Sequence, residues 1–233
     1  MLLKVEGKGL DAIGFNAPRA RLRQFAVGFL IAGAVAALQQ LGRSWVVGLP
    51  WQLNASFDTA MLFEHLRWNT NSILFEELLF RGYLLYRAIR WLGGRRGVLL
   101  DAAAFGVYHW FSYGLFGNPV MMAFVFLFTG AFGLMLALSF AKTGSIAAPI
   151  GFHLGWNLVS YLVFSTGPLG PAILIPPDGV AAIEPSGLSG ALLGIGLPLL
   201  MILSVSWYLV HSHRALGIVN PDMELKFRLR VDR

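Results

Sequence analysis

Long apolar stretches separated by short polar segments dominate the chain. About 20 apolar residues in an α-helix cross the hydrocarbon core of a bilayer. Read by that length, the pattern predicts six transmembrane helices, at residues 25–41, 72–92, 97–117, 120–141, 145–164 and 189–211. The stretch 56–66 is amphipathic and too short to span, so we expect a helix lying at the membrane interface there. The segment 165–187 contains five prolines and is expected to be irregular.

The composition agrees with this interpretation. Of the 233 residues, 56% are hydrophobic and only 13% are charged, which is about half the usual charged share of a soluble domain. The mean hydropathy is +0.65. These values argue against a soluble enzyme, and the lack of cysteine excludes a thiol nucleophile or a cysteine-ligated metal. We expect an all-α polytopic membrane helix bundle, one domain over residues 1–233 with cytoplasmic tails at 1–24 and 212–233.

The positions of the charges predict an orientation. The chain carries 18 Lys and Arg against 12 Asp and Glu. If the N-terminus is cytoplasmic, 15 of the 18 basic residues lie on the cytoplasmic side of the predicted helices. Such a bias favours both termini inside and an even number of spans. We therefore expect a multi-pass protein of the plasma or inner membrane, and the positive charge needs no nucleic-acid partner to explain it.

Several polar residues fall inside the predicted spans, where they are costly and need a reason. They are Glu76, Glu77, Arg81, Asp101, His109, His153 and Asn157. Glu77 and Arg81 are four residues apart, so they share a helix face and can pair. His153 and Asn157 have the same spacing. Asp101 lies near the inner end of its span, and we expect it at the interface or paired with Arg95 or Arg96.

These residues form three motifs in chain order. Residues 76–81 read EExxxR, residues 105–109 read FxxxH, and residues 153–157 read HxxxN. In this order and on separate spans they resemble the CPBP family, which groups type II CAAX prenyl endopeptidases with bacterial Abi and bacteriocin-processing proteins. The resemblance covers residues 72–164, which it implies to be a four-helix catalytic core.

The resemblance implies a glutamate-dependent intramembrane protease that cleaves a membrane-embedded or lipid-modified protein or peptide. Glu76 would be the general base that activates a water, assisted by His109. His153 and Asn157 would hold the scissile carbonyl and stabilise the oxyanion. Elementary chemistry agrees, because a carboxylate in a water-poor site is a stronger base. The spacing of Glu77 and Arg81 indicates a structural pair, and Phe105 supports the site as the first residue of FxxxH.

Three alternatives use the same residues. Glu76, His109 and His153 could ligate a zinc ion with an open position for water, although the motifs imply a site without a metal or other cofactor. Buried Glu and His also form proton or ion pathways in transporters. A non-catalytic binding or immunity protein could keep the same fold. Loss of cleavage in Glu76→Gln and His109→Ala would favour the protease, whereas loss of flux without any proteolysis would favour a transporter.

Overall fold

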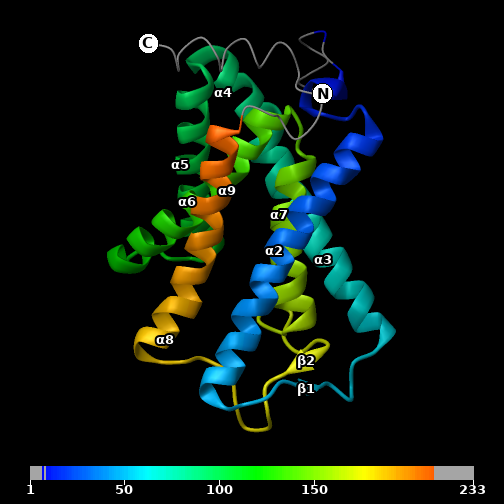
Figure 1. The fold of residues 1–233 in the computed structure, drawn as a ribbon, viewed down its shortest axis with the longest axis vertical. Helices are drawn as coiled ribbons and strands as arrows, with labels where there is room; N and C mark the ends of the chain where they lie inside the picture. The colour runs from blue at the N-terminus through cyan, green and yellow to red at the C-terminus, as the bar shows by residue number, and fades with distance from the viewer. Residues whose placement is uncertain (1–6, 8, 213–233) are drawn as a thin grey trace. The chain divides into compact units, whose positions relative to one another are not determined.

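The computed structural model describes residue 7 and residues 9–212, and most of this part of the chain is helical (Figure 1). The elements in chain order are η1 (Leu10–Ile13), α2 (Pro18–Val47), β1 (Gln52–Leu53), α3 (Thr59–Glu77), η2 (Leu78–Leu84), α4 (Leu85–Leu92), α5 (Gly94–Ser112), α6 (Pro119–Thr143), α7 (Ala147–Asn157), η3 (Leu158–Val163), β2 (Leu174–Ile175), α8 (Gly187–Ala191), η4 (Leu192–Gly196) and α9 (Leu197–His211). The short segments η2, η3 and η4 are π-helical turns that continue α-helices.

Contacts divide the chain into two compact units. Unit 1 comprises the described residues up to Ala26, Phe75–Pro149 and the described residues from Ile202 onward. Unit 2 comprises Val27–Leu74 and Ile150–Met201. The helices α2, α3, α7 and α9 each begin in one unit and end in the other.

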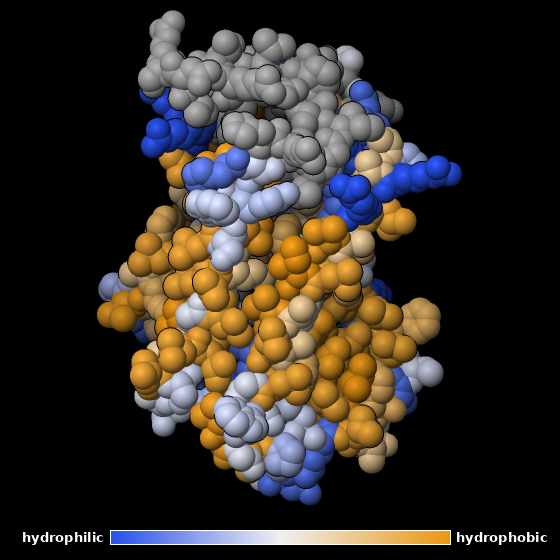
Figure 2. All heavy atoms as spheres, in the orientation of Figure 1, coloured by the Kyte–Doolittle hydropathy of each residue, from blue (hydrophilic) through white to orange (hydrophobic). Residues whose placement is uncertain are grey.

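Three helical stretches in the described part are long and apolar enough to cross a membrane, judged by length and composition. They are Leu10–Val47, Pro119–Thr143 and Gly187–His211, and they contain three of the six predicted spans. Large apolar side chains remain exposed on them, among them Leu127 and Leu200, and apolar residues cover much of the face seen in Figure 2. An exposed apolar surface of this kind suits contact with lipid. The predicted all-α membrane helix bundle is confirmed.

The expected interfacial helix at 56–66 is wrong. Helix α3 runs without a break from Thr59 to Glu77, and the chain stays helical through η2 and α4 to Leu92 with a kink at Gly82. The helix accommodates a polar residue beyond position 66, where the predicted short helix ended. The Asn69 side chain is buried and its Nδ2 donates to the His65 carbonyl oxygen at 2.8 Å, one turn earlier. An amide satisfied in this way does not end a helix.

The N-terminal segment and the proline-rich segment each contain structure that was not predicted. Helix α2 begins at Pro18, inside the segment expected to be an N-terminal tail, and residues 213–233 lie outside the described part. The segment 165–187 is mostly irregular, as predicted, but β2 within it pairs antiparallel with β1. In that pairing Gln52 lies opposite Ile175.

Unit 1 is built around α5 and α6, which pack side by side (Figure 1). Helix α6 begins where Asn118 accepts a hydrogen bond from the Met121 backbone N–H, and it ends at Gly144 in the left-handed conformation, with φ at 62°. Both are typical helix ends. The helices approach closely because Gly106 faces α6. A Cβ there would lie 2.8 Å from Phe126 Cδ2 and 2.9 Å from its carbonyl oxygen.

Candidate active site

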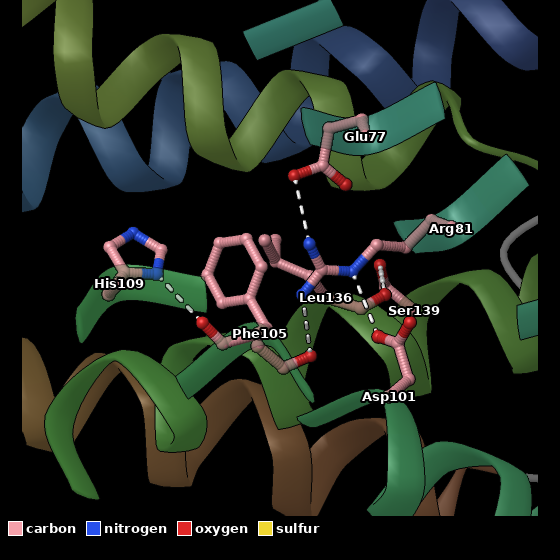
Figure 3. A network of polar contacts seen from close by, with 8 residues as sticks. Glu77, Arg81, Asp101, Phe105, His109, Leu136 and Ser139 are labelled. Carbon is pink, nitrogen blue, oxygen red and sulfur yellow. Dashed lines mark hydrogen bonds and ion pairs between the residues drawn. The ribbon is translucent and has the colours of Figure 1, made fainter. Parts of the chain in front are cut away.

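The ion pair expected within EExxxR is present in unit 1. Arg81 Nη1 lies 3.3 Å from Glu77 Oε1, and neither side chain is exposed (Figure 3). Glu77 is the last residue of α3, and Arg81 lies one turn later in the π-helical segment η2. A π-helical turn inside an α-helix is rare and often marks a functional site. The prediction of a structural pair on one helix face is confirmed.

Arg81 has a second carboxylate partner that comes from another helix. Its Nε lies 3.2 Å from Asp101 Oδ2, and the Asp101 side chain is 3% exposed. The expectation that Asp101 lies at the interface or pairs with Arg95 or Arg96 is therefore wrong. Asp101 belongs to the buried face of α5, whereas Arg95 and Arg96 are exposed. One guanidinium thus lies between two carboxylates, as burial of such charges demands.

The rest of the Arg81 guanidinium is also in contact with unit 1. Nη2 donates to the Gly133 carbonyl oxygen of α6 at 3.1 Å, and Cζ lies 4.1 Å from the centre of the Phe105 ring. The absence of a side chain at Gly133 makes this possible, since a Cβ there would be 2.9 Å from Phe105 Cδ1 and 3.1 Å from Arg81 Nη2. Arg81 therefore joins η2 to both α5 and α6.

Phe105 connects this ion-pair network to His109. The Phe105 ring lies between the Arg81 guanidinium and the His109 imidazole (Figure 3), and the two ring centres are 4.6 Å apart. His109 Nδ1 is 2.8 Å from the Phe105 carbonyl oxygen. Because a carbonyl oxygen only accepts, Nδ1 carries the proton, and the neutral ring keeps its lone pair on Nε2. His109 is thereby fixed in a tautomer that can take up a proton at Nε2.

Glu76 lies in the same unit, in the last turn of α3, and is 9% exposed. Its carboxylate interacts electrostatically with the phenols of Tyr108 and Tyr113. Both tyrosine rings also pack edge-on against His109, with ring centres 5.4 and 5.3 Å away. Tyr108 and Tyr113 thus pack on His109 and lie within electrostatic range of Glu76.

His153 and Asn157 belong to unit 2, where α7 presents them one turn apart. His153 is buried, and Asn157 is the last residue before the π-helical turn η3. Helix α7 packs closely on α2 in this unit, because a Cβ at Gly155 would collide with the Phe29 backbone. The structure thus brings Glu76, Glu77, Arg81, Phe105 and His109 together in unit 1. The meeting of His153 and Asn157 with that group stays a prediction.

A comparison with protein-family models gives a match to one segment of the chain. Residues 60–159 match the model described as type II CAAX prenyl endopeptidase Rce1-like. This segment is an Rce1-like domain. All three motifs lie within this matched segment, and the model's description is that of a protease. Searches of curated proteins and of solved structures found no match.

The Rce1-like domain starts at the first turn of α3, since the match begins at residue 60 and α3 at Thr59. The site residue that sequence reasoning missed is Asp101. A signal was present, because Asp101, Phe105 and His109 recur at intervals of four residues and so share one face of α5.

A metal site needs several His, Asp or Glu side chains close together. Among residues 9–212, no group of three or more His, Asp or Glu side chains lies close enough together to hold a metal ion. His65 is buried on α3 outside the three motifs. His211 lies at the end of α9 with its Nδ1 bonded to the Trp207 carbonyl oxygen, and His213 lies outside the described residues.

Proposed function

We propose that this protein is an intramembrane endopeptidase that hydrolyses a peptide bond of a membrane-embedded or lipid-modified substrate. Glu76 and His109 activate the attacking water, and His153 and Asn157 stabilise the oxyanion. The observation that carries the proposal is the family match over residues 60–159, which contains every residue of the three motifs. The contacts within unit 1 support the individual roles.

The division of labour between the adjacent glutamates follows from their contacts. Glu77 is fully buried against Arg81 at 3.3 Å, so its charge is balanced and its position fixed. Consecutive residues on a helix point about 100° apart, so Glu76 does not share the direction of Glu77, and its charge acts on Tyr108 and Tyr113. We therefore assign the general base to Glu76 and a structural role to Glu77.

His109 can assist the base by exchanging a proton at one of its two ring nitrogens. The Nδ1 proton is engaged with the Phe105 carbonyl oxygen, so Nε2 is the atom that can accept a proton from the water or return one to the leaving amine. A group that transfers protons in this way contributes about 10²- to 10⁴-fold in rate. The packing of Phe105 and two tyrosines holds the imidazole in one orientation.

The oxyanion site uses two donors on one helix. His153 and Asn157 are one turn apart on α7, so an imidazole N–H and an amide N–H can point at one oxygen. Each such donor contributes about 3 kcal/mol to transition-state stabilisation. Asn157→Ala should therefore lower kcat by about 10²- to 10³-fold with little effect on KM.

The substrate and the setting complete the proposal. The apolar exposed helices suit a membrane-bound enzyme and a substrate that reaches the site from the bilayer, such as a prenylated peptide or a membrane peptide. We place the protein in the plasma or inner membrane as a multi-pass protein with both termini cytoplasmic, on the strength of its basic residues. The residues assigned to the reaction require no cofactor.

The test compares membrane peptides in cells that produce the wild type, Glu76→Gln or Glu64→Gln. Glu64 is an exposed carboxylate on the same helix, so its variant is a matched control. We expect peptide fragments that depend on the wild type and on Glu64→Gln and are lost with Glu76→Gln. In ¹⁸O water the new carboxyl end should carry one ¹⁸O. Fragments that persist with folded Glu76→Gln protein would refute the assignment.

A further inference from the structure

A strongly basic surface lies where α4 meets α5, away from the proposed site residues. Four arginines occur within ten residues, at Arg87, Arg90, Arg95 and Arg96, and the last three are exposed. The sequence has no acidic residue between Glu77 and Asp101, and both of these are buried against Arg81. The segment that contains Arg95 and Arg96 thus supplies no acidic residue from its own sequence, residues 78–100.

The connection is a rigid support. Gly93 links the two helices with φ at 83° and ψ at 163°, a conformation open only to glycine. Four residues later Gly97 lets the helices touch, since a Cβ there would lie 2.8 Å from the Ile89 backbone nitrogen. The exposed arginines therefore belong to a fixed helical hairpin of unit 1, whose backbone is drawn in Figure 1.

The start of α5 is suited to an anion. Helix N-termini carry partial positive charge and favour acidic residues in the first turn. The first turn of α5 has no acidic residue and carries Arg95 and Arg96 instead. Gly93, which precedes the helix, supplies no side-chain cap. Like charges are gathered at the positive end of the helix dipole, so an external anion would stabilise this end.

Apolar side chains beside the arginines indicate where that anion comes from. Trp91 is 71% exposed and Leu99 is 52% exposed. The Arg87 guanidinium lies 4.1 Å from the Trp91 ring centre. A tryptophan, leucines and arginines together are typical of a membrane interface, where the ring lies at headgroup level and the cations meet phosphates. A soluble phosphate would leave the apolar residues in water.

We propose that the α4–α5 hairpin binds the phosphate headgroups of anionic phospholipids through Arg95, Arg96 and the amino end of α5, with Trp91 at the boundary between the headgroups and the acyl chains. Arg87 supports Trp91 from one side. Arg90 is anchored to α4 by its bond to the Tyr86 hydroxyl at 2.7 Å. This surface is independent of the proposed proteolysis.

The experiment uses the full chain in nanodiscs that contain phosphatidylcholine and increasing shares of phosphatidylglycerol with brominated acyl chains. Bromine quenches nearby tryptophan, and the difference between wild type and Trp91→Phe isolates the signal of Trp91. We expect phosphatidylglycerol to be enriched about tenfold over phosphatidylcholine at this site. Arg95→Gln/Arg96→Gln should lose that enrichment, and Arg95→Lys/Arg96→Lys should keep most of it.

The matched control is Arg43→Gln/Arg67→Gln, which removes two positive charges from α2 and α3 and should leave the enrichment unchanged. Equal loss in both double variants would show a net-charge effect and overturn the proposal. Equal quenching by brominated phosphatidylcholine and phosphatidylglycerol in the wild type would do the same. Full competition by inorganic phosphate at millimolar concentration would assign the surface to a soluble anion instead of a lipid.

Discussion

Arg81 and Asp101 form an ion pair of 3.2 Å between η2 and the buried face of α5. Asp101 is the second carboxylate on the Arg81 guanidinium, which also pairs with Glu77. It also holds the guanidinium at the Phe105 ring, and Phe105 in turn packs on His109. A chain of direct contacts therefore runs from Asp101 to the histidine proposed to assist catalysis.

Asp101→Asn should destabilise the protein, because it leaves a buried guanidinium with one carboxylate where it had two. Removing a partner from a buried ion pair costs about 3 kcal/mol. The free energy of unfolding in mixed detergent micelles measures the effect. Asp178→Asn changes an exposed carboxylate and should leave the stability unchanged. Equal stability of wild type and Asp101→Asn would show that the pair contributes nothing.

Gly133→Ala should disturb the same network from α6. The added methyl would lie 2.9 Å from Phe105 Cδ1 and 3.1 Å from Arg81 Nη2, and overpacking of this kind costs about 1–3 kcal/mol. Gly130→Ala, one turn earlier, meets only the Ala102 carbonyl oxygen at 3.4 Å. That control should be as stable as the wild type. If Gly133→Ala and Gly130→Ala unfold at the same detergent composition, the close packing at Gly133 does not contribute to stability.

The sequence correctly predicted contacts between residues that are neighbours along one helix. The Glu77–Arg81 pair follows from a spacing of four residues, and the α-helical membrane fold follows from the length of apolar stretches. Contacts between helices could not be read in this way. The partner of Asp101 depends on how α5 is rotated against η2, and the local excess of Arg95 and Arg96 suggested the wrong one. Likewise, the buried hydrogen bond from Asn69 Nδ2 to the His65 carbonyl oxygen lies inside α3, past residue 66, where the predicted short helix ended.

His109→Asn should separate the structural and the chemical role of His109. The asparagine amide can replace Nδ1 as the donor to the Phe105 carbonyl oxygen, which lies 2.8 Å from Nδ1, but it has no equivalent of Nε2. We expect a folded protein whose kcat for peptide cleavage falls by about 10²- to 10⁴-fold. His65→Asn, on a buried histidine outside the motifs, is the control for the loss of any imidazole. Wild-type turnover in His109→Asn would remove His109 from the mechanism.

Chelation separates the glutamate mechanism from the zinc alternative. If Glu76 activates water without a metal, cleavage should continue at the wild-type rate after dialysis against a strong chelator, and the purified protein should contain less than stoichiometric zinc. A zinc site built from Glu76, His109 and His153 predicts the opposite, because three protein ligands and an open position for water define a catalytic zinc. The decisive measurement is the metal content of wild type and His153→Ala by mass spectrometry, together with the rate before and after chelation. Activity that disappears with the chelator and returns with added zinc would replace the glutamate base with a metal-bound hydroxide.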